Sequence, residues 1–121
     1  MIFLHYPKCS TCKNAKRLLN KNEITYEERD IKENNPTFEE IKDWHIKSDL
    51  PIKTFFNTSG IIYKEMNLKN KISQMTNEEC YKLLSTNGML VKRPILVGNN
   101  TIIVGFNKNN SNQWESINET T

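Results

Sequence analysis

The order of the first three segments constrains this chain more than any other feature. Residues 2–6 are apolar and β-prone, and Pro7 stops them, which predicts a strand. Residues 10–20 carry apolar side chains on one stripe, which predicts a helix beginning at or just after Cys9. Residues 24–31 alternate in polarity and predict a second strand. A strand–helix–strand unit favours a right-handed crossover with parallel strands.

The middle of the chain predicts only helices. Thr37 and Thr76 each stand three residues before a glutamate, which is the spacing of a capping box at a helix start. Pro51 opens a short helix that we expect to end near Ser59-Gly60, and Gly88 ends the helix that follows Thr76. The residues expected to face inward on the two capped helices are Ile41, Trp44, Ile46, Cys80, Leu83 and Leu84.

The end of the chain predicts a β-hairpin and a short helix. Residues 95–97 and 101–104 are β-prone and flank the turn Gly98-Asn99-Asn100. Residues 113–117 predict a terminal helix, and we expect residues 119–121 to fray.

The order of these segments determines the fold class. A βαβ half, a helical insertion over about residues 37–90 and a ββα half predict an α/β protein with a thioredoxin-like fold and a four-stranded mixed sheet. The length of 121 residues suits a single domain, residues 1–121. A net charge of +3 is too small for a nucleic-acid-binding surface. No stretch approaches the roughly 20 apolar residues of a membrane span.

The start of the chain predicts a cytoplasmic protein. Its apolar residues 1–4 are too few for a signal-peptide core. The cytoplasm is reducing, so the three cysteines argue for thiol or metal chemistry rather than for structural disulfides.

Cys9 and Cys12 stand at the junction between the first strand and the first helix. Free N–H groups and the positive end of the helix dipole favour the thiolate form of Cys9 there. Lys8, Lys13 and a protonated His5 would act in the same direction. Because Cys12 lies three residues on, a Cys9–Cys12 disulfide is reachable, and the more exposed Cys9 would be the attacking sulfur.

Two other interpretations of the cysteine pair stay open. Zinc needs four ligands, and Cys80, His5 and His45 are the only residues that could complete a site. The pair could also be unreactive, although structural cysteines usually lie in apolar runs rather than at a helix start. On its apolar stripe, Cys80 itself is expected to be buried, and His45 is expected at the surface of its helix.

Arg93-Pro94 is the second informative segment. A proline just before a late strand of a thioredoxin-like chain is where a cis bond would bring backbone groups beside the reactive sulfur. Arg93 would add a guanidinium that can hold an oxyanion or stabilise a thiolate. The spacing alone leaves open the alternative of an edge-strand proline preceded by a solvated arginine.

Six motifs follow one another over nearly the whole chain: Pro7-Lys8-Cys9-Ser10-Thr11-Cys12-Lys13, Phe56-Asn57-Thr58-Ser59-Gly60, Tyr63-Lys64-Glu65, Asn87-Gly88-Met89-Leu90, Lys92-Arg93-Pro94 and Val104-Gly105-Phe106. In this order they resemble the arsenate reductase-like ArsC/Spx/YffB family, most closely its small YusI/YffB-type members. The resemblance implies a thioredoxin-like core with a helical insertion and Cys9 as the nucleophile. It also implies that His5 helps to keep Cys9 ionised and that Arg93-Pro94 supplies the arginine and cis-proline of the active site.

Two departures from the arsenate reductases of this family favour disulfide exchange. Glutaredoxin-linked arsenate reductases place three arginines around the oxyanion, whereas only Arg93 matches here and the other two positions hold Asn57 and Gly105. The loss of two guanidinium groups weakens the binding of a dianion. Those enzymes also have serine three residues after the nucleophile, where this chain has Cys12, a candidate resolving thiol.

The sequence therefore predicts a thiol–disulfide oxidoreductase in which Cys9 attacks an oxidised sulfur and Cys12 resolves the mixed disulfide. We expect thioredoxin, glutaredoxin or a low-molecular-weight thiol as electron donor, a monomer, and no cofactor or metal. The second hypothesis is an Spx-like redox regulator that binds the α subunit of RNA polymerase, although this chain lacks the more charged stretch and the longer tail of those regulators. Glutaredoxin-dependent arsenate reduction is the third.

Overall fold

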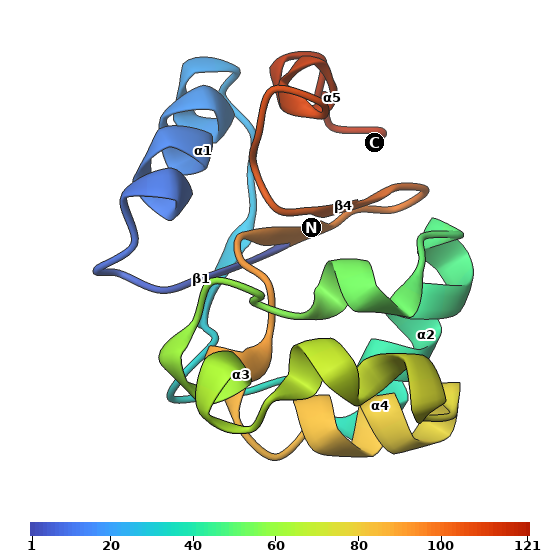
Figure 1. The fold of residues 1–121 in the computed structure, drawn as a ribbon. Helices are drawn as coiled ribbons and strands as arrows, with labels where there is room; N and C mark the ends of the chain where they lie inside the picture. The colour runs from blue at the N-terminus through green and yellow to red at the C-terminus, as the bar shows by residue number, and fades with distance from the viewer. The chain divides into compact units, whose positions relative to one another are not determined.

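A computed structural model describes residues 1–121, which form two compact units. The first unit combines the two ends of the chain, Met1–Asp30 and Arg93–Thr121, and the second is Ile31–Lys92. Figure 1 shows the first unit in blue and orange-red and the second in green and yellow. The single domain expected over residues 1–121 stays a prediction.

The first unit contains the predicted four-stranded mixed sheet. Its strands are β1 (Ile2–His5), β2 (Glu27–Asp30), β3 (Ile95–Val97) and β4 (Ile102–Val104), in the order β2-β1-β3-β4. β1 pairs with β2 in parallel and with β3 in antiparallel fashion, and β3 and β4 form the expected hairpin. The central strand β1 therefore joins the βαβ half to the ββα half.

Helices α1 (Ser10–Lys21) and α5 (Ser111–Glu115) pack side by side on one face of this sheet (Figure 1). One apolar cluster joins the helices to the strands. The buried members of this cluster are Phe3, Ala15, Leu19, Ile24, Leu96, Ile103, Trp114 and Ile117. The indole N–H of Trp114 also donates a hydrogen bond to the carbonyl of Gly105, at 2.9 Å. This core fixes the strand β1 and the helix α1, at whose junction Cys9 and Cys12 lie.

Some boundaries of this unit differ from the sequence-based expectation. β2 begins only at Glu27, because Glu23 takes a left-handed conformation (φ 56°) and pairing starts where Glu27 faces Ile2. The last residues were expected to fray, but the carbonyl of Thr121 accepts a 2.7 Å hydrogen bond from the N–H of Asn100 in the β3–β4 turn. The terminal segment is thus tied to the hairpin.

The second unit is helical, apart from one isolated β-bridge between Phe56 and Val91. Its α-helices are α2 (Phe38–Ser48), α3 (Ile61–Glu65) and α4 (Asn77–Leu84). Four short 3-10 helices connect them: η1 (Ile52–Phe55), η2 (Leu68–Asn70), η3 (Ile72–Gln74) and η4 (Gly88–Leu90). None of the helices in either unit reaches the length and apolar character that a membrane crossing requires.

Both predicted capping boxes are present. The Thr37 hydroxyl accepts from the N–H of Glu40 at 3.1 Å, and the Glu40 carboxylate accepts from the N–H of Thr37 at 3.0 Å. Thr76 and Glu79 repeat the arrangement at 3.1 and 2.9 Å at the start of α4. Each box satisfies two backbone donors that the first helical turn would otherwise leave unpaired.

Four expectations for this unit need correction. Ile46 is 65% exposed, because the inward face of α2 is formed by Ile41 and Trp44. His45 is half-buried rather than at the surface, since its ring bonds to the Tyr81 hydroxyl. The helix that begins after Thr76 ends at Leu84, before Gly88. The helix opened by Pro51 is only the 3-10 helix η1.

Candidate functional site

Cys9 is the N-cap residue of α1. Its backbone is extended (φ −87°, ψ 118°), and its N–H donates to the carbonyl of Tyr6 at 2.9 Å, which turns the chain from β1 into the helix. Its sulfur accepts a hydrogen bond from the N–H of Cys12 at 3.4 Å. The sulfur thus takes the place that a serine or aspartate oxygen usually occupies at a helix start.

Several groups act on the ionisation of Cys9, which is half-buried. Burial raises the pKa of its thiol, but the N–H and thiol of Cys12, the positive charge of Arg93 and the N–H of Thr11 lower it. The lowering groups outweigh burial, so the pKa of Cys9 lies below its ordinary value. Because the thiolate is the nucleophilic form, this environment activates Cys9.

Cys12 has the opposite character. Its side chain is 1% exposed, and burial together with the hydrogen bond to Cys9 and the Cys9 charge raises the pKa of its thiol to about 12. The backbone of Tyr6 and the charge of Arg93 offset only part of this effect. The pair therefore consists of an activated, half-buried sulfur and a buried sulfur that keeps its proton.

Arg93 completes this group from the start of the ββα half. Its guanidinium carbon lies 5.2 Å from the centre of the Tyr6 ring, in a cation–π arrangement. Its Nε and Nη1 atoms are buried and have no hydrogen-bond partner, which contradicts the alternative of a solvated arginine. The Arg93–Pro94 peptide bond is cis, and the Pro94 carbonyl accepts from the N–H of Gly105 at 2.7 Å. A buried donor without a partner destabilises the protein, and an anion that accepted its hydrogen bond would relieve this cost. The two unpaired guanidinium donors of Arg93 are therefore suited to bind an anion.

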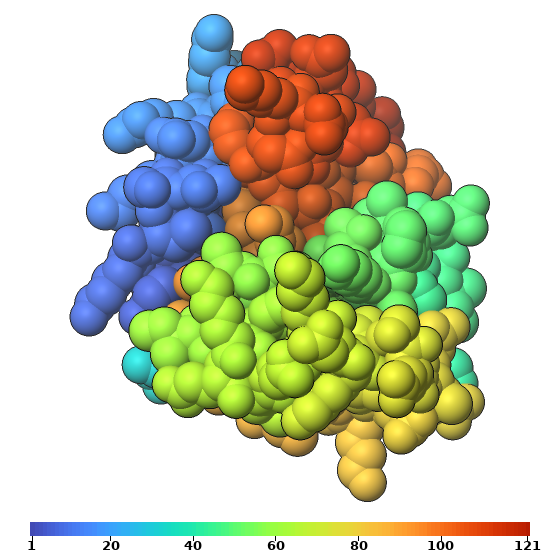
Figure 2. All heavy atoms as spheres, viewed as in Figure 1, coloured from blue at the N-terminus to red at the C-terminus, as the bar shows by residue number.

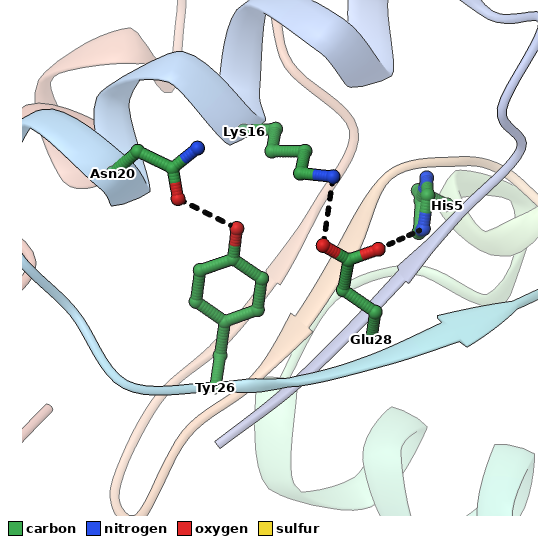
Figure 3. Close-up of polar contacts among 5 residues, drawn as sticks. All are labelled: His5, Lys16, Asn20, Tyr26 and Glu28. Atoms are coloured by element: carbon green, nitrogen blue, oxygen red, sulfur yellow. Dashed lines mark hydrogen bonds and ion pairs between the residues drawn. The ribbon is translucent and has the colours of Figure 1, made fainter.

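His5 lies at the end of β1 and belongs to a separate polar chain, drawn in Figure 3. Its Nε2 lies 3.4 Å from one carboxylate oxygen of Glu28, and the Nζ of Lys16 lies 2.7 Å from the other. Its ring also stacks on Phe3, with 5.1 Å between ring centroids. The groups that lower the pKa of Cys9 are Cys12, Arg93 and Thr11. The expected influence of His5 on Cys9 stays a prediction.

The polar chain of Figure 3 was not foreseen from the sequence. Parallel pairing sets Glu28 beside Phe3, so that its carboxylate lies on the face of the sheet that α1 covers, where Lys16 reaches it. Farther along, the Tyr26 hydroxyl donates to the Asn20 side chain at 2.8 Å. The strand register determines the partners of Glu28, and a single sequence does not show that register.

The remaining predicted residues, Cys80 and His45, belong to the second unit, whereas the cysteine pair belongs to the first. Cys80 is fully buried on α4, as expected. His45 bonds to Tyr81, and its ring packs edge-on against Phe55. Nowhere in the chain do three or more His, Cys, Asp or Glu side chains gather as they would around a metal ion.

Comparison with known proteins gives consistent results. The model of the ArsC family matches residues 4–114. The protein YusI of Bacillus subtilis is 43% identical over 88% of this chain and 90% of its own length. A crystal structure of an ArsC-family-related protein from Bacteroides fragilis is 50% identical, covers 93% of this chain and 95% of its own, and superimposes with a TM-score of 0.88.

Other similar proteins carry functional descriptions. A Streptococcus mutans protein described as a possible arsenate reductase is 42% identical, covers 88% of this chain and 91% of its own, and has a TM-score of 0.83. The regulatory protein MgsR of Bacillus subtilis is 33% identical over 88% of this chain and 83% of its own length. Relatives of this chain thus include both reductase-like and regulatory proteins.

Proposed function

The chain belongs to the ArsC family, and we propose that it acts as a thiol–disulfide oxidoreductase with Cys9 as nucleophile and Cys12 as resolving thiol. The observation that carries the proposal is the contrast between the two sulfurs. The pKa of Cys9 is lowered at the helix start, while the pKa of Cys12, whose N–H lies 3.4 Å from the Cys9 sulfur, is raised to about 12. This contrast favours the thiolate form at Cys9 and the protonated thiol at Cys12 before the reaction begins.

The first step is the attack of the Cys9 thiolate on one sulfur of a substrate disulfide. A Cys9–substrate disulfide forms, the substrate S–S bond breaks, and the leaving sulfur takes the electron pair and then a proton from solvent. This step also removes the negative charge of Cys9. Since that charge is one of the causes that raise the pKa of Cys12, the Cys12 thiol loses its proton more readily in the mixed disulfide.

The second step is the attack of the Cys12 thiolate on the Cys9 sulfur. The Cys9–Cys12 disulfide forms, and the second substrate sulfur leaves as a thiolate, so that two electrons have passed from the protein to the substrate. A dithiol protein such as thioredoxin or glutaredoxin, or two low-molecular-weight thiols of the cytoplasm, would return the two electrons. Arg93 stabilises the Cys9 thiolate by its charge, and its unpaired donors would hold the leaving thiolate.

Single-cysteine variants test this proposal. Incubated with a small disulfide such as oxidised glutathione, Cys12→Ser should accumulate a mixed disulfide on Cys9, visible as an added mass on that peptide. Cys9→Ser should lose disulfide reduction. Cys80→Ser is the matched control, because Cys80 is fully buried on α4. Full activity of Cys9→Ser, or a mixed disulfide on Cys80, would overturn the proposal.

A redox-regulated interaction is the second candidate, and the similarity to the regulatory protein MgsR favours it. In this case formation of the Cys9–Cys12 disulfide would switch the binding of a partner, for which the α subunit of RNA polymerase is the first choice. The α subunit should then bind only one of the oxidised and reduced forms of the protein. Equal binding to both forms, or to neither, rejects this candidate.

Arsenate reduction is the third candidate, favoured by the similarity to the Streptococcus mutans protein. The unpaired Nε and Nη1 of Arg93 would hold the oxyanion beside Cys9. Turnover of arsenate with glutathione and glutaredoxin, lost in Arg93→Ala, would support it. Absence of turnover in the unaltered protein rejects it without affecting disulfide exchange.

A further inference from the structure

The motifs Phe56-Asn57-Thr58-Ser59-Gly60 and Tyr63-Lys64-Glu65 belong to the second unit and have no role in the disulfide-exchange steps proposed for Cys9 and Cys12. Both contribute to a cavity of about 240 Å³ in the second unit. Its lining residues are Thr58, Tyr63, Lys64, Asn67 and Lys69. Figure 2 shows this stretch of the chain, in yellow-green, at the surface of the molecule. We propose that this cavity binds the phosphate group of a small molecule.

The charge of the lining supports an anion. Lys64 and Lys69 are both exposed, neither forms an ion pair, and the lining contains no acidic residue. Two ammonium groups match the charge of about −1.5 to −2 that a phosphate ester carries at neutral pH. Lysine binds phosphate as a point charge, whereas a planar carboxylate is better matched by the fork of an arginine. The lining therefore favours phosphate over carboxylate.

The hydroxyl of Tyr63 is a second and independent indication. The side chain is 4% exposed, and its hydroxyl is buried without a hydrogen-bond partner. A buried hydroxyl without a partner is destabilising, so a ligand that accepts its hydrogen bond would recover that free energy on binding. Among the lining residues, Tyr63 is the one whose polar group is both buried and unpaired.

Asn67 also presents a donor rather than an acceptor. Its backbone is left-handed (φ 54°), and its side-chain oxygen accepts a 2.8 Å hydrogen bond from the amide of Asn70. The N–H₂ group of Asn67 can therefore turn toward a ligand and donate to it. Together with the Thr58 hydroxyl, the lining offers donors of several kinds to one acceptor-rich group.

The volume limits the size of the ligand. Pockets for drug-sized molecules usually measure about 300–1,000 Å³, so a cavity of about 240 Å³ suits a smaller one. Free inorganic phosphate and a small phosphate monoester both meet this limit and share the chemistry that the lining recognises.

The test is an NMR titration of the full chain, labelled with ¹⁵N, at constant ionic strength. The chemical shifts of the backbone amides report binding. Inorganic phosphate should give saturable shifts centred on residues 58–70. Glycerol 3-phosphate is the second probe: tighter binding would assign the cavity to a phosphorylated molecule, and equal or weaker binding to free phosphate. Saturable binding of acetate with equal affinity, or shifts that never saturate, would overturn the proposal.

Variants separate a built site from general charge. Lys64→Met/Lys69→Met should weaken phosphate binding by at least about tenfold, because each lost contact is a charge-assisted hydrogen bond. The matched control is Lys71→Met/Lys82→Met, which has the same net charge and removes two exposed lysines outside the cavity. Equal weakening in both double variants would overturn the proposal.

Tyr63→Phe supplies a readout that does not depend on the lysines. Without ligand, this variant should unfold at the same temperature as the parent protein or a higher one, since it loses an unpaired buried hydroxyl. Phosphate should raise the unfolding temperature of the parent more than that of the variant. A variant that is stabilised by phosphate as strongly as the parent would overturn the role of Tyr63. None of these measurements requires Cys9, so they stand apart from the proposed thiol chemistry.

Discussion

The N–H of Cys12 lies 3.4 Å from the sulfur of Cys9, while the thiol of Cys12 is 1% exposed and keeps a pKa of about 12. One residue thus supplies both a donor that stabilises the Cys9 thiolate and the thiol that we propose as the resolving group for a mixed disulfide on Cys9. The chemical difference between the two sulfurs arises from the deep burial of Cys12, which raises its pKa, and from the hydrogen bond that the Cys12 N–H donates to the Cys9 sulfur, which lowers the pKa of Cys9.

The reactivity of Cys9 should depend on Arg93. The rate at which iodoacetamide alkylates Cys9 follows the fraction of thiolate. The pH at which this rate reaches half of its maximum should therefore lie below that of an ordinary cysteine thiol. Arg93→Met removes a charge that lowers the pKa of Cys9, and the midpoint should move to higher pH, with several-fold slower alkylation at pH 7. Peptide mass mapping identifies the alkylated sulfur. An unchanged midpoint in Arg93→Met would show that the charge of Arg93 does not lower the pKa of Cys9. Arg17→Met is the control, because it removes an exposed arginine of α1 and should leave the midpoint where it is.

Burial of Cys12 should make folding sensitive to alkaline pH. The folded pKa of about 12 is above the ordinary value of 9.0, so the folded state holds the proton more tightly than the unfolded state. The resulting stability is fully present below pH 9 and is lost as the pH rises from about 9 to 12. Urea unfolding at a series of pH values should show a smaller alkaline loss in Cys12→Ala than in the parent. If the free energy of unfolding fell equally with pH in both proteins, the alkaline loss would not come from Cys12.

Gly88 should tolerate no side chain. A Cβ at this position would lie 1.7 Å from the backbone carbonyl oxygen of Ile31, and backbone cannot move aside as a side chain can. We expect Gly88→Ala to lower the free energy of unfolding by more than about 3 kcal/mol, measured by urea titration. Gly60→Ala is the matched control, since its Cβ would meet mainly the movable side chain of Asn57, at 2.8 Å. Similar losses at the two positions would argue against the close approach of residues 31 and 88.

Trp114 should contribute more to stability than its place in a short helix suggests. It is fully buried in the cluster between α1, α5 and the sheet. Trp114→Ala should cost about 3–5 kcal/mol of unfolding free energy, because it removes a large side chain from a packed core. Trp114→Phe keeps most of the packing and should cost less, chiefly the hydrogen bond to Gly105. Circular dichroism during urea unfolding measures both, and equal losses would show that the hydrogen bond outweighs the packing.

Local signals in the sequence predicted much of the fold. Thr37 and Thr76 marked two helix starts through their capping boxes, and the turn at residues 98–100 marked the hairpin. The strand–helix–strand order at the start of the chain gave the parallel pairing of β1 and β2. These features depend on residues that are close together in the sequence, which is why a single sequence reveals them.

Two kinds of feature were harder to predict: very short helices, and contacts between residues that are distant in the sequence. The helix α3 and the 3-10 helices η2 and η3 are too short to show an apolar period, so residues 61–74 gave no signal. The ion pairs of Glu28 depend on the register between β1 and β2. The unpaired hydroxyl of Tyr63 likewise depends on burial, since the motif Tyr63-Lys64-Glu65 says nothing about which atoms find partners.

The thiol site is assembled from the two ends of the chain, because β1 and Cys9 belong to the same unit as β3 and Arg93. During synthesis on the ribosome, Cys9 leaves the exit tunnel long before Arg93 has been made. Until then, the nascent chain lacks the guanidinium and the central strand pairing that the finished protein provides. We therefore expect the environment that lowers the pKa of Cys9 to be complete only late in translation, so that an incomplete chain carries a cysteine closer to an ordinary thiol.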